Sequence, residues 1–285
     1  EMFPFDGTPI GSDNAPWYEY RNRVVSVNIA DGITDIGRYA FYECSNLTSV
    51  QIPNSVVTIY YNAFSGCSSL ANVAIPETVT NINRSAFQNC TSLVNVNIPE
   101  AVTSIVGVFD GCTSLASIKI PGNVTSIGSA FRGCTSLTTI EIPDSVTDIS
   151  NAFEGCSNLT SVNIPQSVTT IGWRAFEGCS SLTSIEIPES VTSIKWGAFV
   201  GYSSLTNITL PRGITSIEGE TFSGCSGLTS INIPEGVTSI GNSAFEGCSS
   251  LVSISIPDSV TSIGIVAFYG CSSLTEINIP AGVTS

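Results

Sequence analysis

Ten cysteines are the residues of this sequence best equipped to do chemistry. A thiolate can attack an electrophile, bind a metal or pair with a second cysteine. The cysteines recur once every 22 or 23 residues, and their file is interrupted only at Tyr202. Its members are Cys44, Cys67, Cys90, Cys112, Cys134, Cys156, Cys179, Cys225, Cys248 and Cys271.

The regular spacing argues against disulfides and against a metal site. Tyr202 divides the file into runs of seven and three cysteines, so pairing neighbours would leave one thiol over in each run. No C-x-x-C motif occurs, and a straight file cannot surround a zinc ion as a tetrahedron. We therefore predict buried, reduced thiols that act as small apolar side chains, with no metal and no cofactor.

The absence of histidine bears on catalysis. Without histidine, the chain lacks the usual general base and the common partner of a catalytic serine or cysteine. The 23 acidic residues could supply paired carboxylates, so a hydrolase stays a less favoured alternative. No unit of the sequence breaks its pattern to build a pocket, however, and we predict that the protein is not an enzyme.

The cysteines belong to a repeat that reads L-x-x-I-x-I-P-x-x-V-T-x-I-x-x-x-A-F-x-G-C-S-x. Its units are 23 residues long, except for three consecutive units of 22 residues at 93–114, 115–136 and 137–158. The missing residue lies just before the Ala-Phe or Val-Phe pair, which marks a surface loop where a change of length is cheap. The units begin at Val24, Leu47, Leu70, Leu93, Leu115, Leu137, Leu159, Leu182, Leu205, Leu228, Leu251 and Leu274.

Each part of the repeat predicts a local structure. The L-x-x-I-x-I segment predicts a short strand that the following proline ends, because proline has no N–H group to donate. The V-T-x-I segment predicts a second extended stretch, and A-F-x-G-C predicts a helical or 3₁₀ turn with a left-handed exit at glycine. No unit can bury its own apolar residues, so the units must stack like on like. The stacked phenylalanines are Phe41, Phe64, Phe87, Phe109, Phe131, Phe153, Phe176, Phe199, Phe222, Phe245 and Phe268.

Units of the form LTSIEIPESVTSI…AFxGCSS resemble the BspA-like class of bacterial leucine-rich repeats over about 24–285. The lead-in PWYEYRNRVVSVNIADGITDIG resembles the N-terminal cap of surface proteins in that family. The resemblance implies a cell-surface or secreted protein of the kind found in host-associated bacteria and some mucosal protozoa. Several members act as adhesins, but the repeat alone does not identify a ligand.

The expected fold is a β-rich (α/β) leucine-rich-repeat solenoid, right-handed, with about twelve stacked coils. A parallel sheet covers one face, and short helical or 3₁₀ turns complete each coil. Residues 1–23 break the period and are expected to form an N-terminal cap with aromatic residues such as Phe3, Phe5 and Trp17. Residues 24–285 form the solenoid, whose C-terminal end has no cap.

The sheet face is the first candidate binding surface. The fifth residue of each first strand should point outward, and this file is charged only around residues 119–186. A merely solvated face is the alternative. The candidates on this face are Lys119, Glu141, Asn163, Glu186 and Thr209.

An aromatic loop edge is the second candidate. Trp173, Trp196 and Tyr61 all lie two residues after an isoleucine of the repeat. The two tryptophans fall in adjacent coils, where they are expected to stack and to offer an exposed hot spot. The alternative is that they fold over the loop and shield the edge of the core.

The net charge of the chain restricts the classes of partner that it can bind. A net charge of −14 argues against nucleic acid and anionic membranes, and no apolar stretch is long enough for membrane insertion. We predict a non-enzymatic protein-binding scaffold, a cell-surface or secreted adhesin whose partner is a host or neighbouring-cell protein. A structural or self-assembling component, associating through the C-terminal end, is the alternative. An ice-binding protein is less favoured, because its threonine file lacks a flat second rank.

Overall fold

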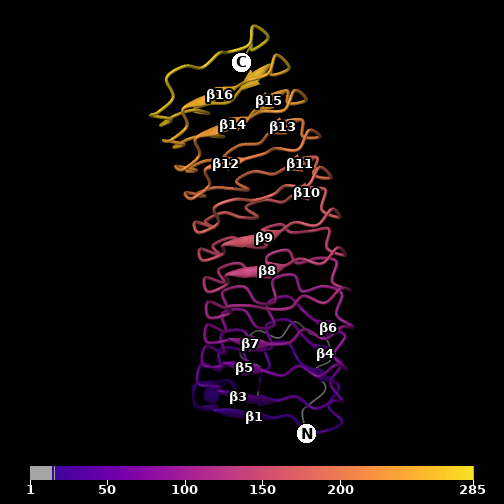
Figure 1. Ribbon diagram of the computed structural model, residues 1–285. Helices are drawn as coiled ribbons and strands as arrows, with labels where there is room; N and C mark the ends of the chain where they lie inside the picture. The colour runs from indigo at the N-terminus through magenta and orange to yellow at the C-terminus, as the bar shows by residue number, and fades with distance from the viewer. Residues whose placement is uncertain (1–14, 16, 285) are drawn as a thin grey trace.

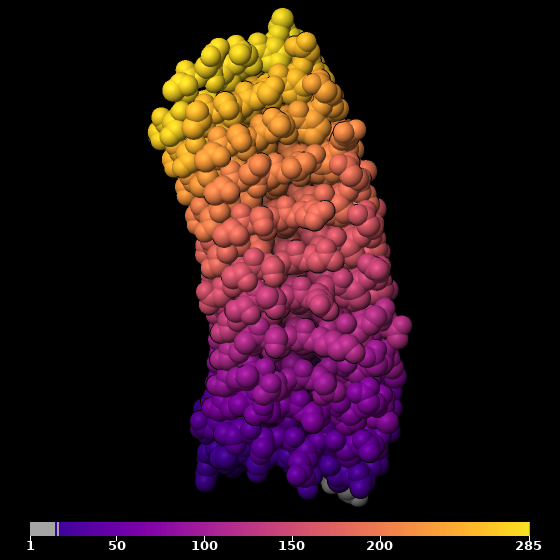
Figure 2. Space-filling view, viewed as in Figure 1, coloured from indigo at the N-terminus to yellow at the C-terminus, as the bar shows by residue number. Residues whose placement is uncertain are grey.

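Each repeat forms one coil, and successive coils stack in a single direction, so β1 (Ser26–Asn28) and β17 (Ser262–Ile263) lie near opposite ends of a long column (Figure 1). Stacking is the only way in which such short units can bury their apolar side chains. The computed structural model describes residue 15 and residues 17–284, so Phe3 and Phe5 lie outside the described part. Figure 2 shows the coils as closely packed layers of one column.

The L-x-x-I-x-I segments form a first file of strands, which we call the first sheet face. Neighbouring strands are parallel and in register with the unit before, as where Val27 lies opposite Val50. The file comprises β1 (Ser26–Asn28), β3 (Ser49–Gln51), β5 (Asn72–Val73), β7 (Asn95–Val96), β8 (Thr139–Glu141), β9 (Ser161–Asn163), β12 (Asn207–Ile208), β14 (Ser230–Asn232) and β16 (Ser253–Ser255).

The V-T-x-I segments form a second strand file, beyond the single sheet expected from the sequence. It runs along the other side of the column in Figure 1 and is also parallel, with the order β2-β4-β6, β10-β11 and β13-β15-β17. The strands are β2 (Asp35–Ile36), β4 (Thr58–Ile59), β6 (Asn81–Ile82), β10 (Thr170–Ile171), β11 (Ser193–Ile194), β13 (Ser216–Ile217), β15 (Ser239–Ile240) and β17 (Ser262–Ile263).

Both files weaken in the three short units, residues 93–158, which we call the short-coil segment. The second file is reduced there to isolated bridges from Ser104 to Ser126 and from Ser126 to Asp148. The first file has no strand between β7 and β8. The short-coil segment thus has less sheet pairing than the neighbouring long coils on both sides of the column.

The A-F-x-G-C segment forms turns of the predicted 3₁₀ type but not a helix. Its hydrogen bonds do have 3₁₀ spacing, as where the Cys67 N–H donates to the Phe64 carbonyl at 3.1 Å. Two residues of each such turn have positive φ, however, such as Asn62 (56°) and Gly66 (78°), and this stops a helix from forming. Within the described residues the one 3₁₀ helix is η1 (Tyr18–Arg23), ahead of the first coil.

The predicted phenylalanine column is confirmed. The eleven rings stack from Phe41 to Phe268 with centroids 5.2–6.2 Å apart, and the indole of Trp17 adds a further ring 5.7 Å from Phe41. Ten turns separate the first phenylalanine from the last, fewer than the expected twelve coils, because eleven units carry a ring and the unit that begins at Leu274 contributes none. The extent of the predicted cap at 1–23 stays a prediction.

The cysteines are free and lie beside this column, nine of them buried. They are more than apolar fillers, because each thiol from Cys67 onward donates a hydrogen bond to the carbonyl of a phenylalanine in the preceding coil. The Cys67 Sγ lies 3.1 Å from the Phe41 oxygen, and the Cys134 Sγ lies 3.3 Å from the Phe109 oxygen. The thiol therefore adds a second hydrogen bond to a buried carbonyl that already accepts the main-chain N–H of the cysteine in its own coil, as where the Phe41 carbonyl accepts from Cys44.

Candidate binding surfaces

The gap between β7 and β8 opens a hollow of about 1070 Å³ on the first sheet face. Its floor includes residues 117–120, where no strand forms. Among the described contacts, the main-chain groups of Ser117, Ile118 and Lys119 hydrogen-bond to neither neighbouring coil. Half-buried Ile118 and Val96 also line the hollow, so it combines apolar patches with unused main-chain donors and acceptors.

The structure separates the five residues predicted on this face into two groups. All five side chains are exposed, as the alternation of the strand requires. Lys119, Glu141 and Asn163 line the hollow, whereas Glu186 and Thr209 lie in later coils, away from it. The sequence therefore located the outward file but not the position along it at which the surface is hollowed.

Asparagines that the sequence analysis did not select form one wall of the hollow. The Asn97 amide donates to the Ile75 carbonyl at 2.7 Å and accepts from the Ile75 N–H at 2.9 Å. The Asn95 amide donates to Asn72 Oδ1 at 2.8 Å. These contacts tie the side chains to the coil before and hold them in fixed orientations. The sequence does contain a signal for this wall, because two neighbouring repeats carry asparagine at the same strand position, Asn72 and Asn95.

Charges at the hollow are available to a partner. Lys119 Nζ lies 3.1 Å from Glu100 Oε1, but both side chains are mostly exposed, so this ion pair contributes little to stability. Glu141 makes no ion pair among the described residues. The two groups place opposite charges on neighbouring coils of the same outward file.

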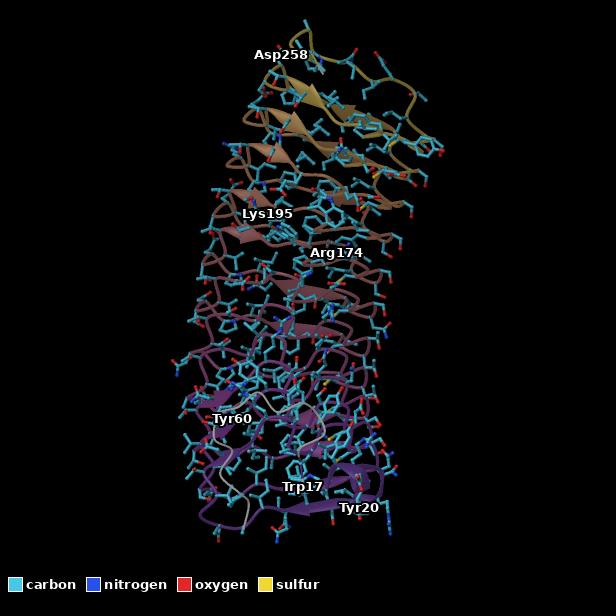
Figure 3. All side chains as sticks on the ribbon, turned by 180° about the vertical axis from the view of Figure 1, so that it is seen from behind. Trp17, Tyr20, Tyr60, Arg174, Lys195 and Asp258 are labelled. Carbon is cyan, nitrogen blue, oxygen red and sulfur yellow. The ribbon has the colours of Figure 1, made fainter. Side chains whose placement is uncertain are left out.

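The aromatic loop edge differs from expectation, because the two tryptophans do not stack on each other. Trp173 is 62% exposed, while Trp196 is only partly exposed. The Arg174 guanidinium lies over the Trp196 ring, 4.9 Å from its centroid, and so takes the place expected for the second indole. Figure 3 shows Arg174 and Lys195 on this part of the column.

Ion pairs neutralise the cations beside Trp196. Arg174 Nε is 3.2 Å from Glu177 Oε2, and Lys195 Nζ is 3.0 Å from Glu218 Oε1. The second carboxylate oxygen of Glu218 accepts a hydrogen bond from the main-chain N–H of Trp196 at 3.0 Å. Trp196 is thus fixed in the coil edge, as the shielding alternative supposed, and Trp173 alone is freely exposed.

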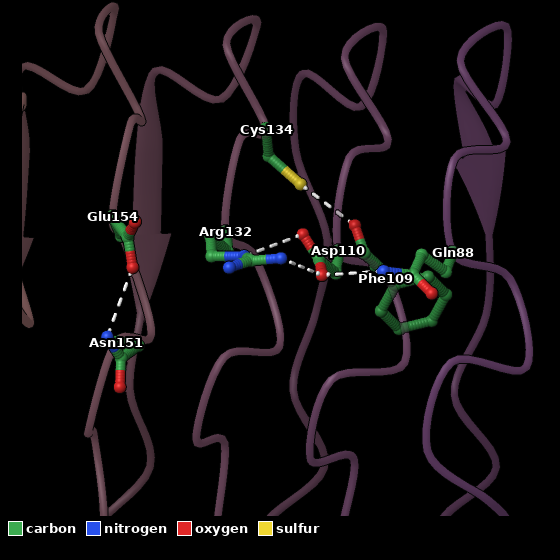
Figure 4. A network of polar contacts seen from close by, with 7 residues as sticks. All are labelled: Gln88, Phe109, Asp110, Arg132, Cys134, Asn151 and Glu154. Atoms are coloured by element: carbon green, nitrogen blue, oxygen red, sulfur yellow. Dashed lines mark hydrogen bonds and ion pairs between the residues drawn. The ribbon is translucent and has the colours of Figure 1, made fainter.

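A polar ladder crosses the short-coil segment next to the phenylalanine column (Figure 4). Arg132 donates two hydrogen bonds to the Asp110 carboxylate, from Nε to Oδ1 at 3.0 Å and from an Nη to Oδ2 at 2.8 Å. Gln88 donates to the same carboxylate at 2.9 Å. The bidentate geometry fixes the spacing of three coils where sheet pairing is weakest.

The buried thiols are unreactive at neutral pH. Burial raises the pKa of the Cys112 and Cys156 thiols to about 12, so they stay protonated and poorly nucleophilic. At Tyr202 the file is broken by a fully buried phenol whose hydroxyl has no hydrogen-bond partner. Burial raises the pKa of Tyr202 as well. Among the described residues, no group of three or more acids or cysteines could hold a metal ion.

The stacked parallel coils, the buried column and the outward polar file together define a leucine-rich-repeat solenoid. The family model for the BspA type leucine rich repeat region matches residues 15–129, 106–218 and 197–285. The chain belongs to this family of BspA-type leucine-rich-repeat proteins, and such repeats suggest a scaffold for protein interaction.

Solved structures of bacterial leucine-rich-repeat proteins are similar over most of the chain. A protein from Bacteroides ovatus is 33% identical with a TM-score of 0.76, covering 92% of this chain and 74% of that one. A leucine-rich cell surface protein from Faecalibacterium prausnitzii is 37% identical with a TM-score of 0.65, covering 88% and 78%. A protein from Eubacterium ventriosum is 25% identical with a TM-score of 0.68, covering 96% and 83%.

The search of curated proteins found no significant match. Within the described residues, no helix has the length and apolar character needed to cross a membrane.

Proposed function

We propose that the protein is a non-enzymatic scaffold at a cell surface that binds a protein partner through the hollow of the first sheet face. The hollow carries this proposal, because it joins apolar floor residues, fixed asparagines and two unlike charges within one concave site. A concave apolar site with a few fixed polar groups is the usual form of a binding site.

The chemistry of the chain supports a binding role. It has no histidine, and the buried thiols are protonated at neutral pH, so the described residues offer no activated nucleophile. Surface location is supported by the family and by the Faecalibacterium relative, which is described as a cell surface protein. By this reasoning the partner is a host or neighbouring-cell protein.

The test compares two substitutions of the same type on the same outward file. Glu141→Lys reverses a charge inside the hollow, and Glu186→Lys makes the same change in a coil outside it. Each variant and the parent chain are immobilised and probed with purified extracellular-matrix and serum proteins, and dissociation constants are measured for any partner that binds the parent.

The proposal expects Glu141→Lys to weaken binding at least tenfold while Glu186→Lys changes it less than twofold. Equal losses in the two variants would spread the contact over the whole sheet face and overturn the hollow as the site. Unchanged binding in Glu141→Lys, together with loss in Trp173→Ala, would move the site to the aromatic loop edge. Thermal unfolding of each variant checks that the coils remain folded.

A further inference from the structure

Three consecutive coils carry Arg38, Tyr61 and Arg84 at the same loop position, two residues after the isoleucines of the second strand file. Register places these residues one above another, because Ile36 pairs with Ile59 and Ile59 with Ile82. With strands about 4.8 Å apart, the two arginine backbones are roughly 10 Å apart, with the tyrosine between them.

Neither arginine has an acidic partner among the described residues. The ion pairs there engage other cations, namely Arg21, Lys119, Arg132, Arg174 and Lys195. The Arg38 guanidinium instead lies 5.1 Å from the centroid of the Tyr61 ring. Asp35 is the acid nearest to Arg38 in sequence, and its carboxylate accepts a hydrogen bond from the Thr34 hydroxyl at 2.7 Å. In a chain of net charge −14, this edge therefore carries two arginines, two coils apart, without an ion pair among the described residues.

A recess of about 220 Å³ lies beside Tyr61 and Arg84. No acidic residue lines it; its polar lining consists of neutral amides and hydroxyls together with the Arg84 guanidinium. It is smaller than the roughly 300–1,000 Å³ of pockets for drug-sized ligands, so it has room for a single ring. The neutral polar groups that line it are Thr80, Asn81, Asn83, Thr103 and Ser104.

The recess lies where the first short coil follows the last long one. Arg84 is in that last long coil, and its aliphatic stem lies across Gly107 of the next coil. A Cβ at Gly107 would come 3.0 Å from the Arg84 Cγ, so glycine leaves the room that the arginine stem occupies. The exposed Arg84 side chain is thus held at the rim of the recess.

We propose that this recess binds one sugar ring that carries a carboxylate or sulfate group. The Arg84 guanidinium suits the planar or tetrahedral oxyanion, because its N–H groups can donate in pairs. Amide and hydroxyl side chains both donate and accept, which matches the hydroxyl groups of a sugar. The half-exposed ring of Tyr61 offers an apolar face to the C–H groups of the sugar, and its position under Arg38 keeps it in place.

The probes are three tetrasaccharides of equal length: one containing hexuronate, one of sulfated neutral sugar and one uncharged glucan. Binding to the full chain is measured by calorimetry at low and at moderate salt. We expect the uncharged glucan to bind at least tenfold more weakly than one of the charged probes, and the charged probe to lose affinity as salt is raised. The stronger of the two charged probes identifies the anionic group as carboxylate or sulfate.

Variants separate this site from general charge attraction. Arg84→Ala is expected to weaken binding at least tenfold, whereas Arg132→Ala, an arginine already held by Asp110, should change it less than twofold. Tyr61→Phe should retain binding that Tyr61→Ala loses. Equal binding of the glucan, an unchanged Arg84→Ala variant, or equal binding of a tetraglutamate peptide would overturn the proposal. The Glu141→Lys variant should bind the sugar normally, so the two proposed sites can fail independently.

Discussion

The short-coil segment, residues 93–158, differs from the long coils at 205–273 in its sheets but not in its core. The long coils carry the three-stranded ladders β12-β14-β16 and β13-β15-β17, whereas the short coils keep only single bridges in the second file. Phenylalanine rings are 5.4 Å apart in the long coils and 6.0–6.2 Å apart in the short ones. Phe109, Phe131 and Phe153 nevertheless remain fully buried.

The difference shows that two kinds of contact hold the column together and respond differently to coil length. Burial of the rings is non-directional, so it tolerates a shift of nearly an ångström. Backbone hydrogen bonds need aligned donors and acceptors, so the short coils keep some ladder bonds, such as that from the Ile105 N–H to the Ser126 carbonyl, and lose others. Where the ladder fails, the surface opens, and both the hollow and the Arg84 recess lie at this segment.

The thiol file is common to both segments, so alkaline pH should destabilise both. Burial raises the pKa of Cys112 and Cys248 to about 12 in the folded state. Stability is complete below the pKa of the unfolded thiol, near 8.5, and falls as pH rises, because the unfolded chain then loses protons that the folded chain keeps. Each of the nine buried thiols adds to this loss of stability, which begins near pH 9 and grows as pH rises.

Urea-unfolding midpoints under reducing conditions at pH 7, 9, 10 and 11 measure this loss. A variant with Cys112, Cys156 and Cys248 changed to alanine should lose stability with pH about one third less steeply. A midpoint that stays constant from pH 7 to pH 10 in the parent chain would contradict the buried, protonated file.

Core truncation comes next in size and compares the two ring spacings directly. Phe131→Ala in the short-coil segment and Phe245→Ala in the long coils should each cost about 3–5 kcal/mol, because both rings are fully buried. We expect the Phe245 variant to lose more, since its neighbours are nearer. Calorimetric unfolding checks the order, and a larger loss at Phe131 would show that ring spacing does not measure packing.

Restoring the missing residue tests whether coil length is the cause of the weak ladder. Insertion of one serine between Val106 and Gly107, Gly128 and Ser129, and Ser150 and Asn151 makes all three coils 23 residues long. In long coils the residue after the isoleucine donates its N–H to the preceding coil, as at Tyr60 and Asn83, whereas Val106 and Gly128 have no such bond among the described contacts. Each regained backbone hydrogen bond is worth about 1 kcal/mol, so amide exchange at Val106 and Gly128 should slow about fivefold. The same insertion after Tyr61 in a long coil is the control and should speed exchange.

Substitution of Tyr202 has the smallest expected effect on stability. It tests the bulk of a side chain in a coil of full length, where coil length cannot explain the missing strand. The unit that begins at Leu182 has full length, yet it too lacks a first-file strand, and it holds this buried phenol in a thiol position. Tyr202→Phe should stabilise the chain by about 1 kcal/mol, because the buried hydroxyl has no partner. Thermal unfolding measures the gain, with exposed Tyr269→Phe as the neutral control; a loss in the Tyr202 variant would reveal a bond that the phenol makes.

Much of the fold was predictable because the repeat is periodic. The period of the repeat predicted that each phenylalanine lies above its counterpart and that the cysteines are unpaired. Both predictions were confirmed. The helical turn was predicted wrongly. Nine of its glycines signalled one left-handed residue, but the second, at positions such as Asn62 and Ser85, carries varied residue types and gives no such signal.

The sequence by itself determined which side chains point inward, which point outward and how far apart like residues lie along the chain. These follow from local periodicity, which every unit repeats. Only the tertiary structure decided where the sheet opens, that Arg174 rather than Trp173 covers Trp196, and that each thiol from Cys67 onward bonds to a phenylalanine carbonyl in the preceding coil. Those outcomes depend on contacts between neighbouring coils, which no single unit contains, because each side chain settles against residues of the coil before or after it.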